Sequence, residues 1–299
     1  MENWNALTDY SVEQAVRLLA IDSPSGYTRR AAEYVMDLYR GLGYAPAMTT
    51  KGGVLVCLNP DAPAENGLLL EAHLDTLGAM VTEITAAGRL RATNLGGLNP
   101  NNGEAENVRI VTRSGKVYTG TFQLHNASVH VNGAYSDTKR SFDAMEVVID
   151  EEVESRKDVE KLGIMAGDII CFDPRTVVTE SGYIKSRFLD DKLSVAVLLG
   201  QAKAAAEGQM KLSRQVWHHI TVFEEVGHGG AASVPAGVSE AISVDMGCVG
   251  DGLGCDERQV SICAKDSGGP YHYGMTTRLV NLARDNGLDY AVDIYPHYS

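Results

Sequence analysis

The sequence predicts an α/β fold that is interrupted by a β-rich segment. Apolar runs and helical periodicity alternate at both ends of the chain. The middle carries short alternating runs separated by Gly, Asn and Asp. The length of 299 residues exceeds the usual size of a single core. We therefore expect a discontinuous α/β domain at residues 1–80 and 178–299, with a mixed central sheet flanked by helices, and an inserted β-rich domain at residues 81–177.

The elements of the α/β domain are marked by caps and apolar periodicity. Ser11 and Gln14 resemble a capping box and predict a helix that begins there. A second helix is expected from Thr28 to Gly41. The further elements expected are helices at 192–206 and 276–285 and strands at 54–58, 68–70, 217–223, 241–245 and 290–294.

The inserted segment reads as a small β-barrel or sandwich, because its strands are short and closely spaced. Residues 151–163 are charged and predict a short helix. The strands expected here are 108–112, 117–124, 128–131 and 166–172.

Composition restricts the partners and the compartment. The formal net charge of -13 argues against nucleic acid, because phosphate binding needs a basic face. The five cysteines form neither a CxxC pair nor a framework, which favours a reducing compartment. The N-terminus lacks a basic region followed by an apolar one, and no apolar run reaches membrane-spanning length. We therefore expect a cytoplasmic protein with no membrane partner.

Metal-binding residue types gather at the ends of strand-like runs and at one helix start. Because ligands of open α/β sheets collect at the carboxyl ends of strands, these side chains are expected to converge. They are His73 and Asp75 after strand 68–70, Asp190 and Asp191 before helix 192–206, Glu224 and Glu225 after strand 217–223, and Asp245 after residues 241–244.

Spacing suggests different uses for these residues. His73 and Asp75 point to the same side of a strand, which suits a ligating imidazole and a carboxylate that orients it. Asp190 and Asp191 are either helix caps or include a carboxylate that bridges two cations. Of two adjacent glutamates, one can bind metal while the other acts on water. Any one of these acids alone is more often a cap or a solvated residue.

Imidazole and carboxylate ligands suit zinc, cobalt or manganese ions. Two such ions would polarise a scissile carbonyl and lower the pKa of a water between them. A nearby glutamate would take the proton from that water and pass it to the leaving amine. The sequence therefore favours a metal-dependent hydrolase.

Four ordered segments resemble the motifs of the M42 family of metallo-aminopeptidases, which includes glutamyl and tetrahedral (TET) aminopeptidases. A fifth, Ser23-Pro24-Ser25-Gly26, resembles the opening segment of that family. The four segments are Ala72-His73-Leu74-Asp75, Leu189-Asp190-Asp191, Glu224-Glu225-Val226-Gly227 and Val244-Asp245.

The resemblance implies roles for these residues. His73 and Asp245 would bind one ion, Glu225 the other, and Asp190 would bridge both. Glu224 would be the general base and Asp75 would orient His73. The implied fold is zinc-exopeptidase-like, with an inserted PDZ-like or β-barrel dimerisation domain. The implied substrates are peptides with free N-termini, and the implied assembly is a homo-oligomer built from dimers, in many members a dodecamer.

One departure concerns the end of the chain. The family supplies a last metal-binding histidine in a Tyr-x-His-Ser-like segment, and this sequence stops at His297-Tyr298-Ser299, where that segment should begin. His297 lacks the matching context and is not assigned as a ligand. The expectation is therefore a C-terminally truncated chain in which the metal on the Glu225 side is bound weakly.

Two other functions remain open on the residues alone. Paired carboxylates also serve glycoside hydrolysis. A non-catalytic assembly or binding protein would be compatible with an incomplete metal site. Against both, an imidazole at a strand end fits metal chemistry, and the expected base Glu224 is present.

Overall fold

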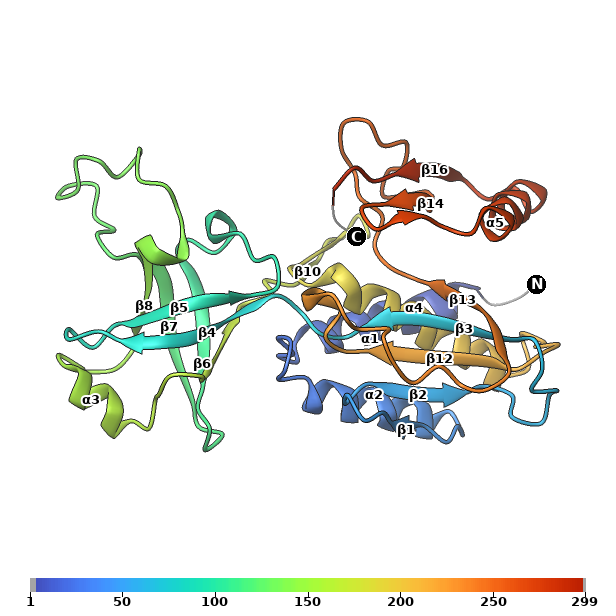
Figure 1. Ribbon diagram of the computed structural model, residues 1–299, viewed down its shortest axis with the longest axis horizontal. Coiled ribbons are helices and arrows are strands. Elements are labelled where there is room, and N and C mark those ends of the chain that lie inside the picture. The colour runs from blue at the N-terminus through green and yellow to red at the C-terminus, as the bar shows by residue number, and fades with distance from the viewer. Residues whose placement is uncertain (1–3, 298–299) are drawn as a thin grey trace. The chain divides into compact units, whose positions relative to one another are not determined.

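Helices pack on a five-stranded sheet whose strands come from both before and after the inserted segment (Figure 1). Strand β3 runs parallel to its neighbours β12 and β13, so these three strands end at the same edge. In sheet order the strands are β1 (Ala47–Met48), β2 (Val54–Cys57), β12 (Val216–Thr221), β3 (Gly67–His73) and β13 (Val238–Ser243), and the helices are α1 (Trp4–Leu19), α2 (Arg29–Gly41) and α4 (Leu189–Ala206).

The computed structural model describes residues 4–297, so Tyr298 and Ser299 of the C-terminal segment lie outside the described residues. The chain divides into two units, one up to Val244 and one from Asp245 onward. The sheet above belongs to the first unit.

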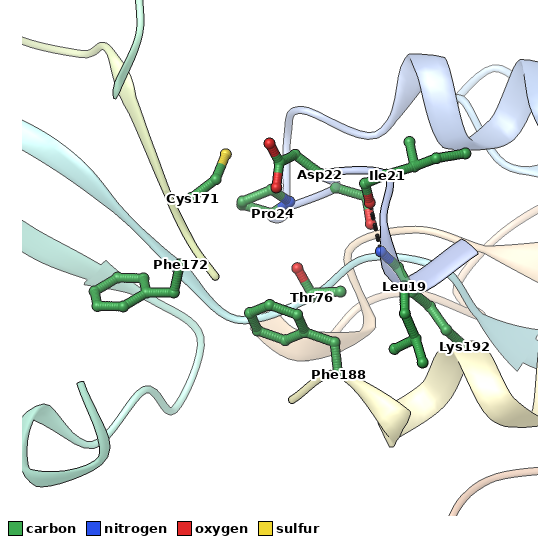
Figure 2. A pocket seen from close by; sticks show the side chains of 10 residues that line it. Leu19, Ile21, Asp22, Pro24, Thr76, Cys171, Phe172, Phe188 and Lys192 are labelled. Atoms are coloured by element: carbon green, nitrogen blue, oxygen red, sulfur yellow. Dashed lines mark hydrogen bonds between the residues drawn. The ribbon is translucent and has the colours of Figure 1, made fainter. Parts of the chain in front are cut away.

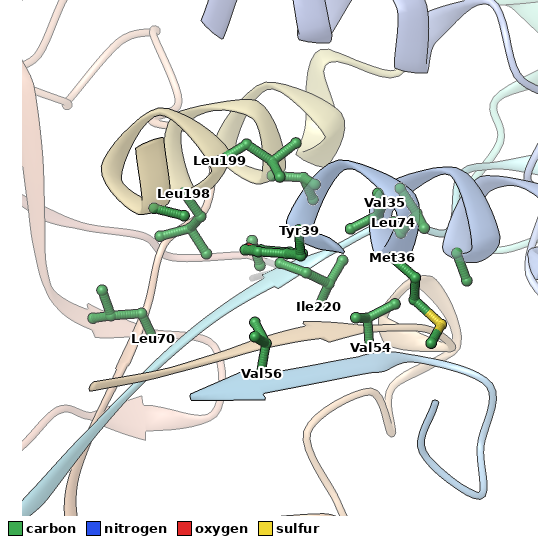
Figure 3. Packing of buried hydrophobic residues seen from close by; sticks show 14 of the residues in the cluster. Val35, Met36, Tyr39, Val54, Val56, Leu70, Leu74, Leu198, Leu199 and Ile220 are labelled. Atoms are coloured by element: carbon green, nitrogen blue, oxygen red, sulfur yellow. The ribbon is translucent and has the colours of Figure 1, made fainter. Parts of the chain in front are cut away.

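The core of this layer is apolar and contributed by both helices and strands. Figure 3 shows Tyr39 of α2 and Leu199 of α4 over Val54 and Ile220 of the sheet, and all four are fully buried. The strand residues that pack here come from the continuous apolar runs of the sequence, as expected for a strand covered by helices.

The inserted segment forms a closed six-stranded barrel with the strand order β4-β5-β8-β7-β6-β9. Its interior is filled by apolar side chains, among them Phe122 and Phe172, whose rings meet edge to face. The strands are β4 (Gly78–Ile84), β5 (Leu90–Leu95), β6 (Glu106–Val111), β7 (Val117–Leu124), β8 (Met145–Ile149) and β9 (Ile169–Phe172), and α3 (Arg156–Lys161) precedes β9. The predicted fold class, a mixed α/β sheet with a small β-barrel, is confirmed.

Ionic and polar contacts join the barrel to the loop after α1 and that loop to α4; Figure 2 shows Lys192 of α4 bonded to Ile21 of the loop. The Arg109 guanidinium donates twice to the Asp22 carboxylate, at 2.8 and 2.6 Å. Nearby, the Lys192 amine donates to the carbonyls of Leu18 and Ile21, at 3.0 and 2.6 Å. Burial lowers the pKa of Lys192 to about 7. These contacts tie the loop after α1 to the barrel and to α4.

The second unit has its own sheet, in the order β15-β14-β16. Its elements are β14 (Val260–Asp266), β15 (Gly269–Pro270), α5 (Tyr273–Asp285) and β16 (Tyr290–Ile294).

In the first unit, a short hairpin precedes α4. It consists of β10 (Val177–Val178) and β11 (Ile184–Lys185). Within residues 4–297, no helix combines the length and apolar content needed to cross a membrane.

Two sequence predictions were wrong. The first helix already includes Trp4, so Ser11 lies inside the helix and does not cap it. Residues 128–131 form turns rather than a strand, because Val131 N–H donates to Ser128 O and Asn132 donates to Asn126 O. Local hydrogen bonds thus replace the ladder that the alternating pattern indicated.

Candidate metal centre

His73 is the last residue of β3 and is 2% exposed. Its Nδ1 lies 2.9 Å from the backbone carbonyl of Asp75. Because a carbonyl oxygen only accepts, Nδ1 carries the proton, and the Nε2 of the neutral ring has a lone pair. The neighbouring residue of β12 is Thr221, so the chain after β12 emerges beside His73.

The two aspartates before the body of α4 occupy different positions. Phe188 has left-handed backbone angles (φ 67°, ψ 20°), and Asp190 and Asp191 depart from helical angles. This local turn places Asp190 Oδ1 at 2.9 Å from His73 Nε2. Asp191 is buried and accepts the backbone N–H of His73 at 3.0 Å. Asp190 therefore faces the His73 ring, while Asp191 fixes the backbone at the end of β3.

The two glutamates begin the short helix η3 (Glu224–Val226) directly after β12. Glu224 Oε2 lies 3.5 Å from His73 Nε2. Burial raises the pKa of Glu225 to about 8, and the nearby negative charge of Asp190 adds to the effect. Glu225 thus belongs to the same cluster of acids.

Asp75 is completely buried beneath this cluster. Its carboxylate accepts the backbone N–H groups of Glu224 and Glu225 at 3.1 and 3.3 Å. The carboxylate is 3.6 Å from His73 Nδ1, farther than the carbonyl of the same residue. Its hydrogen bonds therefore anchor the segment of the glutamates.

The donor set fits a divalent cation. The lone pair of His73 Nε2 faces oxygens of Asp190 and Glu224, and these groups repel one another unless a proton or a cation lies among them. Imidazole nitrogen combined with carboxylate oxygen is typical of zinc, cobalt and manganese sites. The arrangement can therefore hold a metal ion beside a glutamate that exchanges protons.

The remaining predicted ligand, Asp245, directly follows Val244. The backbone N–H of Val244 donates to Glu71 O of β3 at 2.7 Å, which extends the pairing of β13 to this point. Asp245 is the first residue of the second unit.

The histidines near the glutamates have structural partners. His219 packs in β12, 2% exposed, with Nδ1 at 2.7 Å from Glu71 Oε1. His228 stacks on the Phe223 ring with centroids 5.2 Å apart, and the Lys51 amine contacts it.

The sequence motifs include Asp191 and Ser25, but neither residue was assigned a specific role. Ser25 Oγ donates to Asp75 Oδ2 at 2.5 Å. Its place in the Ser-Pro-Ser-Gly segment was visible, but its partner lies fifty positions along the chain. No spacing rule links the two.

Comparison with known sequences points to one family. The sequence model described as M42 glutamyl aminopeptidase matches residues 52–299. The Bacillus subtilis protein named "Putative aminopeptidase YhfE" is 43% identical over 288 residues, which cover 96% of this chain and 83% of that protein. The Glutamyl aminopeptidase of Lactococcus lactis is 26% identical, over 72% of this chain and 59% of its own length.

Comparison of structures shows a shared fold. The Pyrococcus horikoshii TET1 peptidase, described as able to assemble into a tetrahedron or a large octahedral shell, superimposes with a TM-score of 0.80 and 22% identity. The match covers 97% of this chain and 85% of that one.

Proposed function

Because the chain belongs to the M42 glutamyl aminopeptidase family and is thereby a metal-dependent aminopeptidase, we propose that it removes N-terminal residues from peptides at the centre around His73. The observation that carries this proposal is the meeting of His73 Nε2 with Asp190 Oδ1 and Glu224 Oε2 at the edge where β3 and β12 end. Family membership favours this activity over glycoside hydrolysis and over a non-catalytic role.

The proposal assigns two divalent ions, zinc or cobalt and alternatively manganese. His73 and Asp245 would hold one, Glu225 would hold the other, and Asp190 would serve both. Asp190 Oδ1 lies 2.9 Å from His73 Nε2 and its charge helps raise the pKa of Glu225, so Asp190 is near a proposed ligand of each ion, which supports its bridging role. Asp245 is assigned from its match to the Val244-Asp245 motif.

Divalent ions held here would polarise the scissile carbonyl and lower the pKa of a water. Glu224 is the general base: it takes a proton from water and returns it to the leaving amine. Its distance of 3.5 Å from His73 Nε2 supports this role, because the base must lie within reach of the reacting atoms. Asp75 positions the site through its carbonyl contact with His73 and its carboxylate contacts with the glutamate backbone.

The proposal extends to organisation. Residues 1–80 and 178–299 form the catalytic domain, and residues 81–177 form an inserted domain that serves dimerisation. Dimers are the building block of a homo-oligomer, up to a dodecamer, in the cytoplasm. The shells described for the TET1 peptidase support assembly.

Release of amino acids from unblocked peptide arylamides tests the activity. The assay is run with zinc, cobalt or manganese, and again with a chelator. Wild-type protein should cleave only with metal, and Glu224→Gln should lose activity roughly 100-fold or more. Glu180→Gln is the matched control, because Glu180 is an exposed acid in the turn of the β10–β11 hairpin.

Three results would refute the proposal. Equal cleavage of N-terminally blocked peptides would exclude an exopeptidase. Undiminished activity of Glu224→Gln would show that Glu224 is not the general base. Hydrolysis of β-glucan without peptide cleavage would favour glycoside hydrolysis.

A further inference from the structure

The Ser-Pro-Ser-Gly segment at residues 23–26 is hydrogen-bonded to residues 74–76, which directly follow β3. Ser23 Oγ donates to Leu74 O at 2.8 Å, and Thr76 N–H donates to Ser23 O at 2.9 Å. Ser25 N–H donates to Thr76 O at 3.2 Å. The two backbone bonds pair the segments around Pro24 and Thr76 and set Ser25 beside Asp75.

The Ser25 hydroxyl donates to Asp75 Oδ2 at 2.5 Å, and both residues are buried, 6% and 0% exposed. The same carboxylate accepts the N–H groups of Glu224 and Glu225. Three segments far apart in sequence therefore meet on one carboxylate. A buried carboxylate with several donors has a strongly preferred orientation, because each lost bond leaves charge unsolvated.

The orientation of this carboxylate matters most for the glutamates. The His73 ring is held by the backbone carbonyl of Asp75, at 2.9 Å, and not by the carboxylate, at 3.6 Å. Rotation of the carboxylate would therefore disturb the N–H contacts of Glu224 and Glu225 before it disturbed the ring.

We propose that Ser25 is a positioning residue, which acts through Asp75 to hold Glu224 and Glu225 in place. The inference rests on the proposed function for its effect on catalysis, but the contacts that define it do not. Ser25 touches neither the proposed ligands nor the proposed base with its hydroxyl, so its influence passes through the Asp75 carboxylate.

The test compares Ser25→Ala, Ser25→Thr and Ser23→Ala in the full chain. Ser23→Ala is the matched control, because Ser23 is equally buried and its hydroxyl bonds a backbone carbonyl instead of Asp75. Two quantities are measured: kcat and KM on an unblocked peptide arylamide, and the Kd for Zn²⁺ by competition with a chelator.

Ser25→Ala should lower kcat and weaken Zn²⁺ binding by roughly 10- to 100-fold each, the range found when a partner that orients metal ligands is removed. KM should change by less than about twofold, because the Ser25 hydroxyl is buried and bonded to the Asp75 carboxylate. Ser25→Thr, which keeps the hydroxyl, should recover most of both losses, and Ser23→Ala should leave both near wild type.

The two readouts separate this inference from the proposed function. If the wild type lacks peptidase activity but Ser25→Ala still weakens Zn²⁺ binding relative to Ser23→Ala, the proposed function fails and the role of Ser25 stands. If Ser25→Ala matches Ser23→Ala in both kcat and Zn²⁺ affinity, the positioning role is overturned. The same holds if Ser25→Thr is as impaired as Ser25→Ala in both.

Discussion

The buried His218 should make the stability of the fold depend on pH. His218 lies in β12 and is 0% exposed. Its Nε2 is 2.8 Å from Gln201 Oε1 of α4, and its Nδ1 is 2.9 Å from the Tyr39 hydroxyl of α2. Because the amide oxygen only accepts, Nε2 carries the proton and Nδ1 accepts from Tyr39. The neutral ring is thus fully hydrogen-bonded, and a second proton would oppose the Tyr39 donor.

The sign and size of the effect follow from linkage. Burial lowers the pKa of His218 to about 3 in the folded chain. The unfolded chain titrates near about 6.5, so as the pH falls below that value only the unfolded state gains the proton, and stability is lost. At pH 5 the loss attributable to this residue is about 2 kcal/mol, and it grows by about 1.4 kcal/mol per further pH unit until the folded pKa is reached.

Urea unfolding at pH 7.5 and pH 5.0 measures this loss. Trp217, the neighbour of His218 in β12, provides a fluorescence signal from the same strand. The reference is His218→Gln, which removes the titrating group while other titrations remain. The wild type should lose about 2 kcal/mol more than His218→Gln between the two pH values. Equal losses would show that His218 accepts a proton in the folded state, and would refute the reasoning.

Three further predictions concern packing, the barrel junction and metal binding. Leu199→Ala, at a fully buried position of α4, should lower the free energy of unfolding, measured with urea, by about 2–5 kcal/mol. Val197→Ala, at a position 50% exposed on the same helix, should lower it by less than about 1 kcal/mol. Arg109→Ala should lower the free energy of unfolding by roughly 1–3 kcal/mol, because it breaks both hydrogen bonds to Asp22. Arg29→Ala, which breaks the exposed ion pair with Glu33, should lower it by less than about 0.5 kcal/mol. Zn²⁺ at about 100 times its Kd should add about 2.7 kcal/mol of stability. A chelator should remove that gain, and His73→Ala should lack most of it.

The sequence predicted the bounds of an element correctly where the local pattern and the side-chain packing agreed. Thr28 was expected to begin the second helix, and α2 runs from Arg29 to Gly41 with Thr28 at its N-cap. The strand expected at 117–124 is β7 with those bounds. There Tyr118 and Phe122 are buried while their neighbours face outward, so the alternation in sequence reflects one face packed in the barrel.

The prediction for the first helix failed where a tertiary contact overrides a local signal. Ser11 resembles a cap, yet it sits inside α1 against Gly200 of α4, where a Cβ at position 200 would collide with the Ser11 hydroxyl. A small residue at such a position serves close helix packing. That use cannot be distinguished from capping without the partner helix.

The sequence showed which strand ends carry the residues of the candidate site. The apolar runs indicated both strands, and the meeting of His73 with Glu224 follows from the parallel pairing of β3 and β12. Spacing alone could not tell Asp190 from Asp191, because both are the same residue type and the turn at Phe188 decides which one faces His73; only the family resemblance had singled out Asp190.

The loop after the glutamates gives a last prediction, based on two adjacent glycines. A Cβ at Gly229 would lie 3.0 Å from both Cα and Cβ of Glu224 and 3.1 Å from its N. These atoms belong largely to the backbone and cannot yield without moving the proposed base. A Cβ at Gly230 would first meet Glu71 Oε2, at 3.4 Å, which is an ordinary contact. Neighbouring positions therefore differ in whether a methyl group displaces Glu224.

Gly229→Ala should lower kcat on unblocked peptide arylamides by about tenfold or more, since small displacements of a reacting group cost this much. Gly230→Ala, the control from the same loop, should stay within about twofold of wild type. The comparison is made at saturating metal, so that kcat reflects the placement of Glu224 and not metal occupancy. Equal kcat values for the two variants would mean that Glu224 is not held by the close approach of this loop, and that its position tolerates a methyl group beside its backbone.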